Sequence, residues 1–239
     1  EMLRSLVGSE MCIRDRVQSL EELGLGEVFR QITEAPRGLV LVTGPTGSGK
    51  STTLAAMIDH LNQHRQQHIL TIEDPIEFVH PQKNCLVHQR EVQRDTQSFA
   101  TALRAALRED PDVILLGELR DLETIRLALT AAETGHLVLA TLHTSSAAKT
   151  IDRLVDVFPG EEKALVRSML AESLQAVVAQ VLVKKVGGGR VAAHEIMLGS
   201  PAIRNLIRED KVAQMYSAIQ TGGAQGMRTL DMSLKALLA

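Results

Sequence analysis

A glycine-rich segment at residues 44–52 carries the strongest chemical signal in the sequence. It reads Gly-Pro-Thr-Gly-Ser-Gly-Lys-Ser-Thr and fits the phosphate-loop pattern G-x-x-x-x-G-K-[ST]. Its glycines let the backbone approach a ligand, so that N–H groups can surround a β-phosphate at the positive end of the next helix. Lys50 can reach the β- and γ-phosphates, and the Ser51 hydroxyl is a predicted Mg²⁺ ligand. The predicted phosphate-binding residues are Gly44, Pro45, Thr46, Gly47, Ser48, Gly49, Lys50, Ser51 and Thr52.

The residues on either side of this loop favour the strand and the helix that such a loop connects. Residues 39–42 form a short apolar run suited to a buried parallel strand, and residues 52–62 have the spacing of a helix. The alternative, a glycine-rich turn with a lysine by chance, does not account for this context. The sequence therefore predicts a nucleotide site.

Hydrolysis also needs an acid for Mg²⁺ and a group that orients or deprotonates water. Residues 113–116 are apolar, and Glu118 follows them closely. Because strand ends in a sheet of this kind face the nucleotide, Glu118 is predicted to hold Mg²⁺, through water. The alternative is an exposed acid at the end of a strand.

A second acidic segment, residues 73–77, reads Glu-Asp-Pro-Ile-Glu. Three carboxylates in so short a stretch are costly to bring together unless they share a cation or a proton. Glu77 is predicted to activate the attacking water, and the alternative is a solvated turn without a catalytic role.

Isolated histidines and arginines give a weaker signal. His136 and His143 lie at the two ends of one apolar run, where a structural role is more common than a catalytic one. Arg104, Arg108 and Arg153 could contact a phosphate or a neighbouring subunit, although a solvated helix face is the simpler interpretation.

The pattern after the loop predicts an α/β fold. Strands and helices alternate, which favours a mainly parallel sheet covered by helices. The predicted strands are residues 68–72, 85–89, 113–116 and 136–141, and the predicted helices are residues 98–108, 122–134 and 161–174. Residues 177–183 and 191–196 are predicted to form a hairpin with a glycine tip.

These patterns divide the chain into three parts. Residues 1–16 fit nothing downstream and are excluded from the fold prediction. A core follows at residues 17–199, beginning with a capping-box pattern that predicts a short helix from residue 19 to near Gly24. Residues 200–239 are predicted to be a small helical subdomain with helices at 204–208, 212–219 and 229–238.

Composition limits the function classes. The chain has 239 residues, 44% of them hydrophobic, with a net charge of −3 and only five aromatic residues, which argues against nucleic acid as a partner. The two cysteines, Cys12 and Cys85, have no metal-binding spacing and favour a reducing, cytosolic compartment. No apolar stretch is long enough to span a bilayer, so membrane association is expected to go through a protein partner.

Taken together, these motifs resemble the ATPase core of the type II/IV secretion ATPase superfamily, and most closely its type IV pilus retraction enzymes. The resemblance covers residues 17–239. It rests on GPTGSGKST at the loop, TIEDPIEF at 71–78, DPDVILLGELRD at 110–121, AAETGH to ATLHT at 131–144 and AIRNLIRE at 202–209.

The resemblance implies a RecA-like P-loop NTPase core with roles for particular residues. Lys50 and Ser51 would bind the phosphates and Mg²⁺, Glu77 would be the catalytic base, and Glu118 the Walker B acid. His136 and His143 would belong to a histidine box that senses the γ-phosphate or the neighbouring subunit. The implied cofactors are ATP and Mg²⁺.

The resemblance also implies partners. Relatives are hexameric rings on the cytoplasmic face of the inner-membrane pilus platform, where they drive pilin disassembly. They carry a PAS-like N-terminal domain, which is expected to be absent before residue 17.

Besides a retraction paralogue that works alongside the main motor, against which the AIRNLIRE segment argues, three other functions stay open. Secretion or pilus-assembly ATPases of the superfamily usually carry a four-cysteine zinc module after the histidine box, and no cysteine follows Cys85 here. A nucleic-acid motor on the same core is disfavoured by charge and aromatic content. A module that binds nucleotide without turnover is the third alternative.

Overall fold

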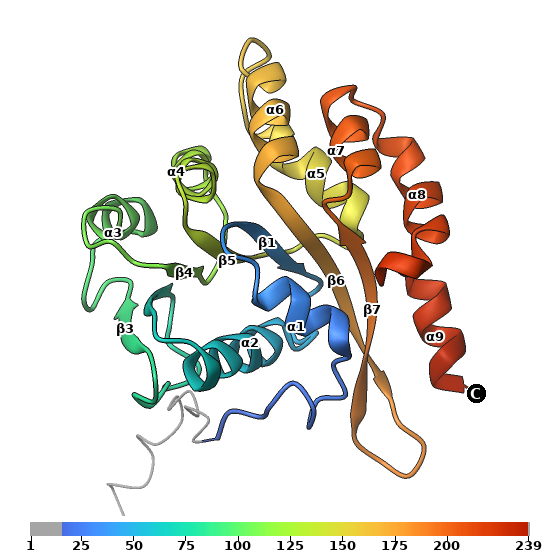
Figure 1. The fold of residues 1–239 in the computed structure, drawn as a ribbon, viewed down its shortest axis with the longest axis horizontal. Helices are drawn as coiled ribbons and strands as arrows, with labels where there is room; N and C mark the ends of the chain where they lie inside the picture. The colour runs from blue at the N-terminus through green and yellow to red at the C-terminus, as the bar shows by residue number, and fades with distance from the viewer. Residues whose placement is uncertain (1–15, 239) are drawn as a thin grey trace, which may run out of the picture.

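A computed structural model describes residues 16–238, so that the predictions for residues 1–15 lie outside the described part. Its centre is a seven-stranded sheet with the order β3-β2-β4-β5-β1-β6-β7 (Figure 1). Among the described strands, only β6 and β7 pair antiparallel. The predicted α/β fold with a mainly parallel sheet is therefore confirmed. The strands are β1 (Gly38–Thr43), β2 (His68–Glu73), β3 (Leu86–Glu91), β4 (Val113–Leu116), β5 (Leu137–Leu142), β6 (Leu174–Lys184) and β7 (Arg190–Leu198).

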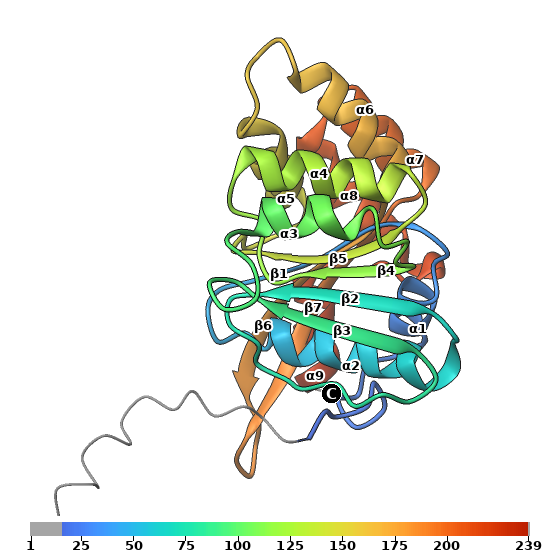
Figure 2. The ribbon, with the colours of Figure 1, turned by 90° about the vertical axis from the view of Figure 1, so that its left-hand side faces the viewer.

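Helices cover both faces of the sheet (Figure 2). Side chains alternate along each strand, so Leu39 and Leu41 of β1 enter one hydrophobic cluster while Val40 and Val42 enter the other. This burial on both faces explains why the central strands β1, β4 and β5 are mostly apolar along their length. The helices are α1 (Glu27–Thr33), α2 (Lys50–His64), α3 (Phe99–Ala106), α4 (Leu122–Glu133), α5 (Ala147–Asp156), α6 (Lys163–Ser173), α7 (Pro201–Arg208), α8 (Met215–Thr221) and α9 (Leu230–Leu238).

The C-terminal helices are present where the sequence predicts helix, but they join the main core. Ile203 and Ile207 of α7, with Met215 and Ile219 of α8, lie in the same cluster as the buried residues of α4 and α6. Near residue 200 the chain thus changes from strand to helix, but the helices that follow still pack into the same hydrophobic core. Residues 212–219, predicted as one helix, divide into a 3₁₀ turn at Val212–Gln214 and α8.

The prediction of a short helix from residue 19 is wrong, because that segment forms only a turn. Both bonds of the capping box are present: the Ser19 N–H donates to Glu22 Oε2 at 3.0 Å, and the Glu22 N–H donates to Ser19 Oγ at 3.2 Å. Gly24 then adopts a φ of +66° and reverses the chain before a second turn can form. The capping pattern therefore marked a real local structure that was too short to be a helix.

In the part of the chain described here, no helix is both long and apolar enough to cross a membrane.

Candidate functional site

The sheet order brings most of the predicted site residues to one edge. The loop follows β1, residues 74–77 follow β2, Glu118 follows β4 and His143 follows β5, and these strands are neighbours in the order β2-β4-β5-β1. Because the strands are parallel, their carboxyl ends meet at the same edge. Segments that lie far apart in the sequence thus converge on one pocket.

The loop adopts the conformation that its glycines predict. Gly44 and Gly49 have φ values of +145° and +89°, in the range that residues with a Cβ rarely adopt. Gly49 occupies the N-cap position of α2 and offers no side chain to its first N–H groups. The start of a helix in such a loop is a site where an anion can bind, which the helix dipole also favours.

Lys50 lies almost buried beneath the loop. It is 8% exposed, and its Nζ donates to the carbonyl oxygens of Gly44 at 2.9 Å and Pro45 at 3.1 Å. Burial lowers the pKa of the Lys50 ammonium, while the charges of Glu118 and Glu77 act in the opposite direction. The amine is therefore held next to the positions where phosphate groups would bind.

Glu77 and Ser51 are in direct contact. The Ser51 hydroxyl donates to Glu77 Oε1 at 2.9 Å, joining the start of α2 to the segment after β2. Two site residues that were predicted from separate motifs thus lie within hydrogen-bond distance of each other. This contact brings the predicted catalytic base to the phosphate side of the pocket.

The carboxylate of Glu118 contacts the side chains of an arginine and a histidine. Its carboxylate contacts Arg120 Nη2 at 2.7 Å and His143 Nε2 at 3.3 Å. Burial opposes ionisation of this carboxyl, but the hydrogen bond from Arg120 and the interactions with His143 outweigh it and lower the pKa of Glu118. Glu118 is thereby kept as an anion at neutral pH.

Glu73 is the first acid of this segment and the last residue of β2. Burial raises the pKa of its carboxyl, although its Oε1 accepts hydrogen bonds from Thr71 Oγ1 at 2.7 Å and Gln89 Nε2 at 3.3 Å. One member of the acidic cluster is therefore shifted toward its neutral form. The main cause is burial of the carboxyl, and the charge of Glu77 makes a smaller contribution in the same direction.

These side chains surround a cavity of about 360 Å³. Of the predicted loop residues, six line it and three, Gly44, Pro45 and Ser48, do not. The six that do are Thr46, Gly47, Gly49, Lys50, Ser51 and Thr52. Glu77, Glu118 and His143 also line it, as do Leu182 of β6 and Arg190 of β7, which the sequence analysis did not identify.

The two predicted histidines do not lie together. His143 follows the C-terminal end of β5 and touches Glu118, whereas His136 precedes the strand at its other end. A six-residue strand separates them by roughly 20 Å. The Nδ1–H of His136 donates to the Ala131 carbonyl at 3.0 Å, at the end of α4. His136 therefore lies outside this pocket, and its predicted role needs a contact elsewhere.

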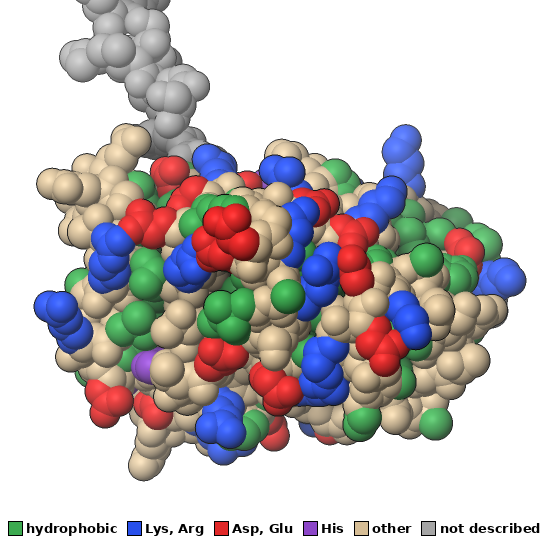
Figure 3. All heavy atoms as spheres, turned by 90° about the horizontal axis from the view of Figure 1, so that it is seen from above, with side chains coloured by type: hydrophobic (Ala, Val, Ile, Leu, Met, Phe, Trp, Pro, Cys, Tyr) green, Lys and Arg blue, Asp and Glu red, His purple; other side chains and the backbone are tan. Residues whose placement is uncertain are grey.

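The arginines considered from the sequence are surface residues. Arg104 pairs with Glu123 of α4, as the solvated-face interpretation expects, and lines no part of the cavity. On the face shown in Figure 3, basic and acidic side chains alternate without a large patch of one sign.

The fold and the pocket together define a P-loop protein of the α/β class. Its glycine-rich loop connects β1 to α2, and two acids follow neighbouring strands. Within that class, the chain belongs to the type II/IV secretion system protein family, whose model matches residues 13–188.

Individual relatives agree with this assignment. The chain is 76% identical to the type IV pilus retraction ATPase PilT of Pseudomonas aeruginosa, over 95% of this chain and 66% of that protein. It is 64% identical to the twitching motility protein of Neisseria gonorrhoeae, over 95% of this chain and 61% of that protein. The chain thus spans about two thirds of the length of these relatives.

Solved structures of relatives have the same fold. The pilus retraction motor PilT with bound ADP superposes with a TM-score of 0.89 at 52% identity, covering 95% of this chain and 64% of that one. The ATPase DotB of Legionella pneumophila gives a TM-score of 0.85 at 36% identity, covering 94% of this chain and 62% of that one.

Proposed function

We propose that this chain is the ATP-hydrolysing core of a hexameric motor that powers retraction of type IV pili. The observation that carries the proposal is the meeting of the phosphate-binding loop, Glu77 and Glu118 in one cavity. Its support comes from similarity to PilT, including a relative with ADP bound.

The side chains around the pocket suit Mg²⁺ bound together with phosphates. The Ser51 hydroxyl and the carboxylate of Glu118 are oxygen donors, the ligand type that Mg²⁺ prefers. The described residues contain no group of three acidic, histidine or cysteine side chains that could hold a metal alone. In nucleotide sites Mg²⁺ is bound by one or two protein oxygens, waters and the substrate phosphates. When bound, Mg²⁺ would neutralise part of the phosphate charge.

In the proposed reaction, loop N–H groups and Lys50 bind the β- and γ-phosphates. Glu77, whose carboxylate contacts Ser51 on the phosphate side, accepts a proton from the attacking water. The water oxygen bonds to the γ-phosphorus while the bond from that phosphorus to the β,γ-bridging oxygen breaks, so that ADP leaves with this oxygen. Glu118 remains ionised beside Arg120 and His143. Release of the γ-phosphate then changes the contacts of His143, while His136 acts at a contact with a neighbouring subunit.

Subunits of a homohexamer would re-pack as rigid bodies on each cycle. The partner is the inner-membrane pilus platform, reached from the cytoplasmic side, and neither nucleic acid nor direct membrane insertion is part of the proposal. A secretion or pilus-assembly ATPase is the alternative within the family. The absence of any cysteine after Cys85 and the higher identity to PilT favour retraction.

The test is the steady-state Mg-ATPase rate per subunit, measured against protein concentration. We expect a rate that rises with concentration, because a site shared between subunits forms only on assembly. Glu77→Gln should bind ATP as the wild type does and lose turnover, since the amide cannot accept the proton.

Two results would contradict parts of this proposal. Normal hydrolysis by Glu77→Gln would remove Glu77 as the base. Binding of ATP by the wild-type chain with no rate above that variant would favour a nucleotide-binding module without turnover.

A further inference from the structure

Gln180 lies on β6 beside the phosphate-binding loop, and it is only 2% exposed. Its Nε2 donates to the Ser48 carbonyl at 2.7 Å, and its Oε1 accepts a hydrogen bond from the Thr53 hydroxyl at 2.8 Å. Ser48 belongs to the loop, and Thr53 lies in the first turn of α2. One buried amide therefore joins β6 to the loop and to the helix after it.

The register of β6 explains why this side chain meets the loop. β6 runs parallel to β1 as far as the pair Thr43–Ala179, and β1 ends at Thr43. Gln180 is the next residue of β6, at the level where the chain leaves the sheet to form the loop. Its neighbours 176–179 and 181–183 are all apolar, so a buried amide here would be costly without its hydrogen-bond partners.

The backbone of β6 also packs closely against the loop. A Cβ at Gly44 would lie 2.2 Å from the Gln180 carbonyl oxygen, and a Cβ at Gly49 would lie 2.9 Å from Gln180 Nε2. At such distances a side chain at Gly44 would have to displace the backbone of β6, and a side chain at Gly49 would have to displace the Gln180 amide. Gly44 and Gly49 are thus needed for two reasons. They adopt the backbone conformation of the loop, and their lack of a Cβ lets β6 pack against it.

We propose that Gln180 is a positioning residue, which fixes the loop in its phosphate-binding conformation before a nucleotide arrives. By orienting the Ser48 carbonyl toward β6 and anchoring the first turn of α2, it keeps the intervening N–H groups directed to the pocket. Binding then costs less ordering of the loop. The inference rests on the proposed nucleotide site, but it does not require hydrolysis, so binding without turnover leaves it intact.

The main test compares Gln180→Met with Gln175→Met. Methionine keeps the length of the side chain and removes both hydrogen bonds. Gln175 is a matched control, because it lies on the same strand and its Nε2 donates to the carbonyl of Arg37, away from the loop, at 2.8 Å. Two measurements are made on the full chain: the Kd for ADP by calorimetry, and amide hydrogen exchange in the ligand-free protein.

For Gln180→Met we expect a Kd for ADP raised on the order of tenfold, because two buried polar groups lose their partner. Exchange should accelerate in peptides covering residues 44–51 and stay unchanged at residues 113–116 in β4. Gln175→Met should change neither measurement by more than twofold. A purely structural role would instead raise exchange in both segments, since global opening exposes both.

A second pair of variants covers the case in which Gln180→Met fails to fold. Thr53→Val removes the hydroxyl that donates to Gln180, and Thr53→Ser restores it. We expect weaker ADP binding and faster exchange at residues 44–51 for the first, and recovery of both for the second. The proposal is overturned if the variants lacking the hydrogen bonds keep wild-type exchange at residues 44–51 and an ADP Kd within twofold of the wild type.

Discussion

At the scale of single residues, the position and hydrogen bonds of Lys50 are fixed before any ligand binds. Its ammonium lies almost buried and is satisfied by the carbonyls of Gly44 and Pro45 at the start of the loop. A buried ammonium needs hydrogen bonds or an opposite charge to remain ionised, and burial already lowers its pKa. The nearby acids Glu77 and Glu118 oppose that shift. Phosphates would add the negative charge that this residue favours.

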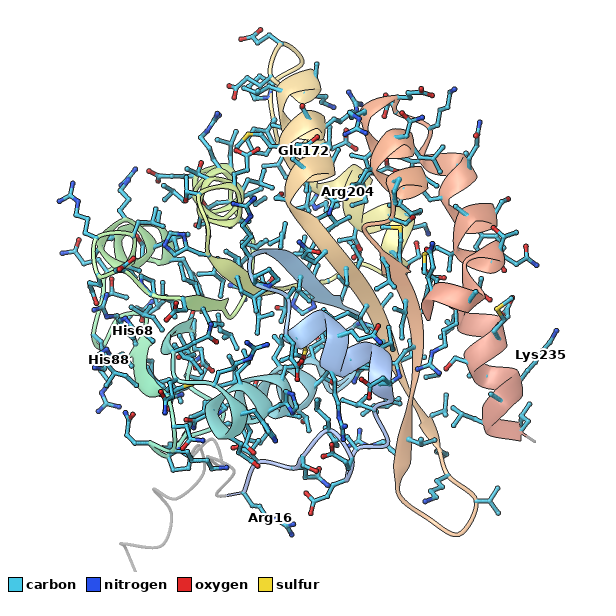
Figure 4. All side chains as sticks on the ribbon, in the orientation of Figure 1. Arg16, His68, His88, Glu172, Arg204 and Lys235 are labelled. Atoms are coloured by element: carbon cyan, nitrogen blue, oxygen red, sulfur yellow. The ribbon has the colours of Figure 1, made fainter. Side chains whose placement is uncertain are left out.

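Replacing this lysine should abolish nucleotide binding. For Lys50→Ala we expect the affinity for ADP to fall about 100-fold or more, because charge-assisted bonds to phosphate are lost. Calorimetric titration with ADP measures this. Lys235→Ala, a change of equal charge on the exposed side of α9 (Figure 4), should keep wild-type affinity. Retained binding by Lys50→Ala would mean that the loop backbone suffices.

At the scale of elements, Arg204 fastens the helix of the AIRNLIRE segment to its neighbours. From α7 its guanidinium donates to the carbonyls of Ala171 and Glu172, to that of Leu174 at 2.9 Å and to that of Gly199 at 2.7 Å. The first three carbonyls lie at the C-terminal end of α6 and the start of β6 (Figure 4). This arginine therefore ties α7 to the strand that also carries Gln180.

Loss of Arg204 should destabilise the chain measurably. For Arg204→Ala we expect the free energy of unfolding to fall by about 2–3 kcal/mol, since carbonyls at a helix end lose a charged donor. Denaturant titration gives the value. Arg208→Ala on the same helix removes an exposed ion pair to Glu172 at 3.0 Å and should cost less than about 1 kcal/mol. Equal effects of the two changes would contradict a special role for Arg204.

At the scale of the whole molecule, His194 lies where α1, β7 and α9 meet. Its ring packs edge-on against Phe29 of α1 at 5.1 Å, and its backbone N–H donates to Ser233 of α9 at 3.0 Å. Burial, with a smaller contribution from Arg228, lowers the pKa of His194 to about 4. The folded chain thus keeps this imidazole neutral at pH values where the unfolded chain protonates it.

This difference predicts that mild acid destabilises the fold. Between the unfolded pKa of about 6.5 and the folded value of about 4, the unfolded state binds more protons, so the free energy of unfolding falls as pH falls. From pH 7 to pH 5, His194 alone should account for a loss of about 2 kcal/mol. Denaturant titrations at both pH values should show that His194→Gln loses less than the wild type by this amount. The same pH dependence in both proteins would contradict the prediction.

Local patterns in the sequence were sufficient where the chemistry is local. The loop needs glycines and a lysine at fixed spacing, so it could be predicted, although α2 already begins at Lys50. The buried strand Val113–Leu116 is a continuous apolar run and was predicted with the observed limits. The turn at Ser19 shows the limit of such reasoning. Its capping hydrogen bonds are present, but only the backbone at Gly24 decides that no helix follows.

Contacts between distant segments could not be read in this way. In the sequence, His136 and His143 lie at the two ends of one strand. The packing of the sheet determines that the carboxyl end of this strand meets Glu118, so that His143 contacts Glu118 and His136 does not. Gln180 lies 132 residues from Ser48 and carries no motif of its own. Its only signal was an amide inside an apolar strand.

The sequence by itself therefore determined the α/β class, and it predicted a phosphate-binding loop with Glu77 and Glu118 as the acids of the site. These depend on residue types and on spacing within one segment. The tertiary structure decided which segments meet at the carboxyl edge of the sheet, that Ser51 contacts Glu77, and that β6 supports the loop through Gln180. The reason is that strand order and register are set by packing on both faces of the sheet, which no single segment encodes.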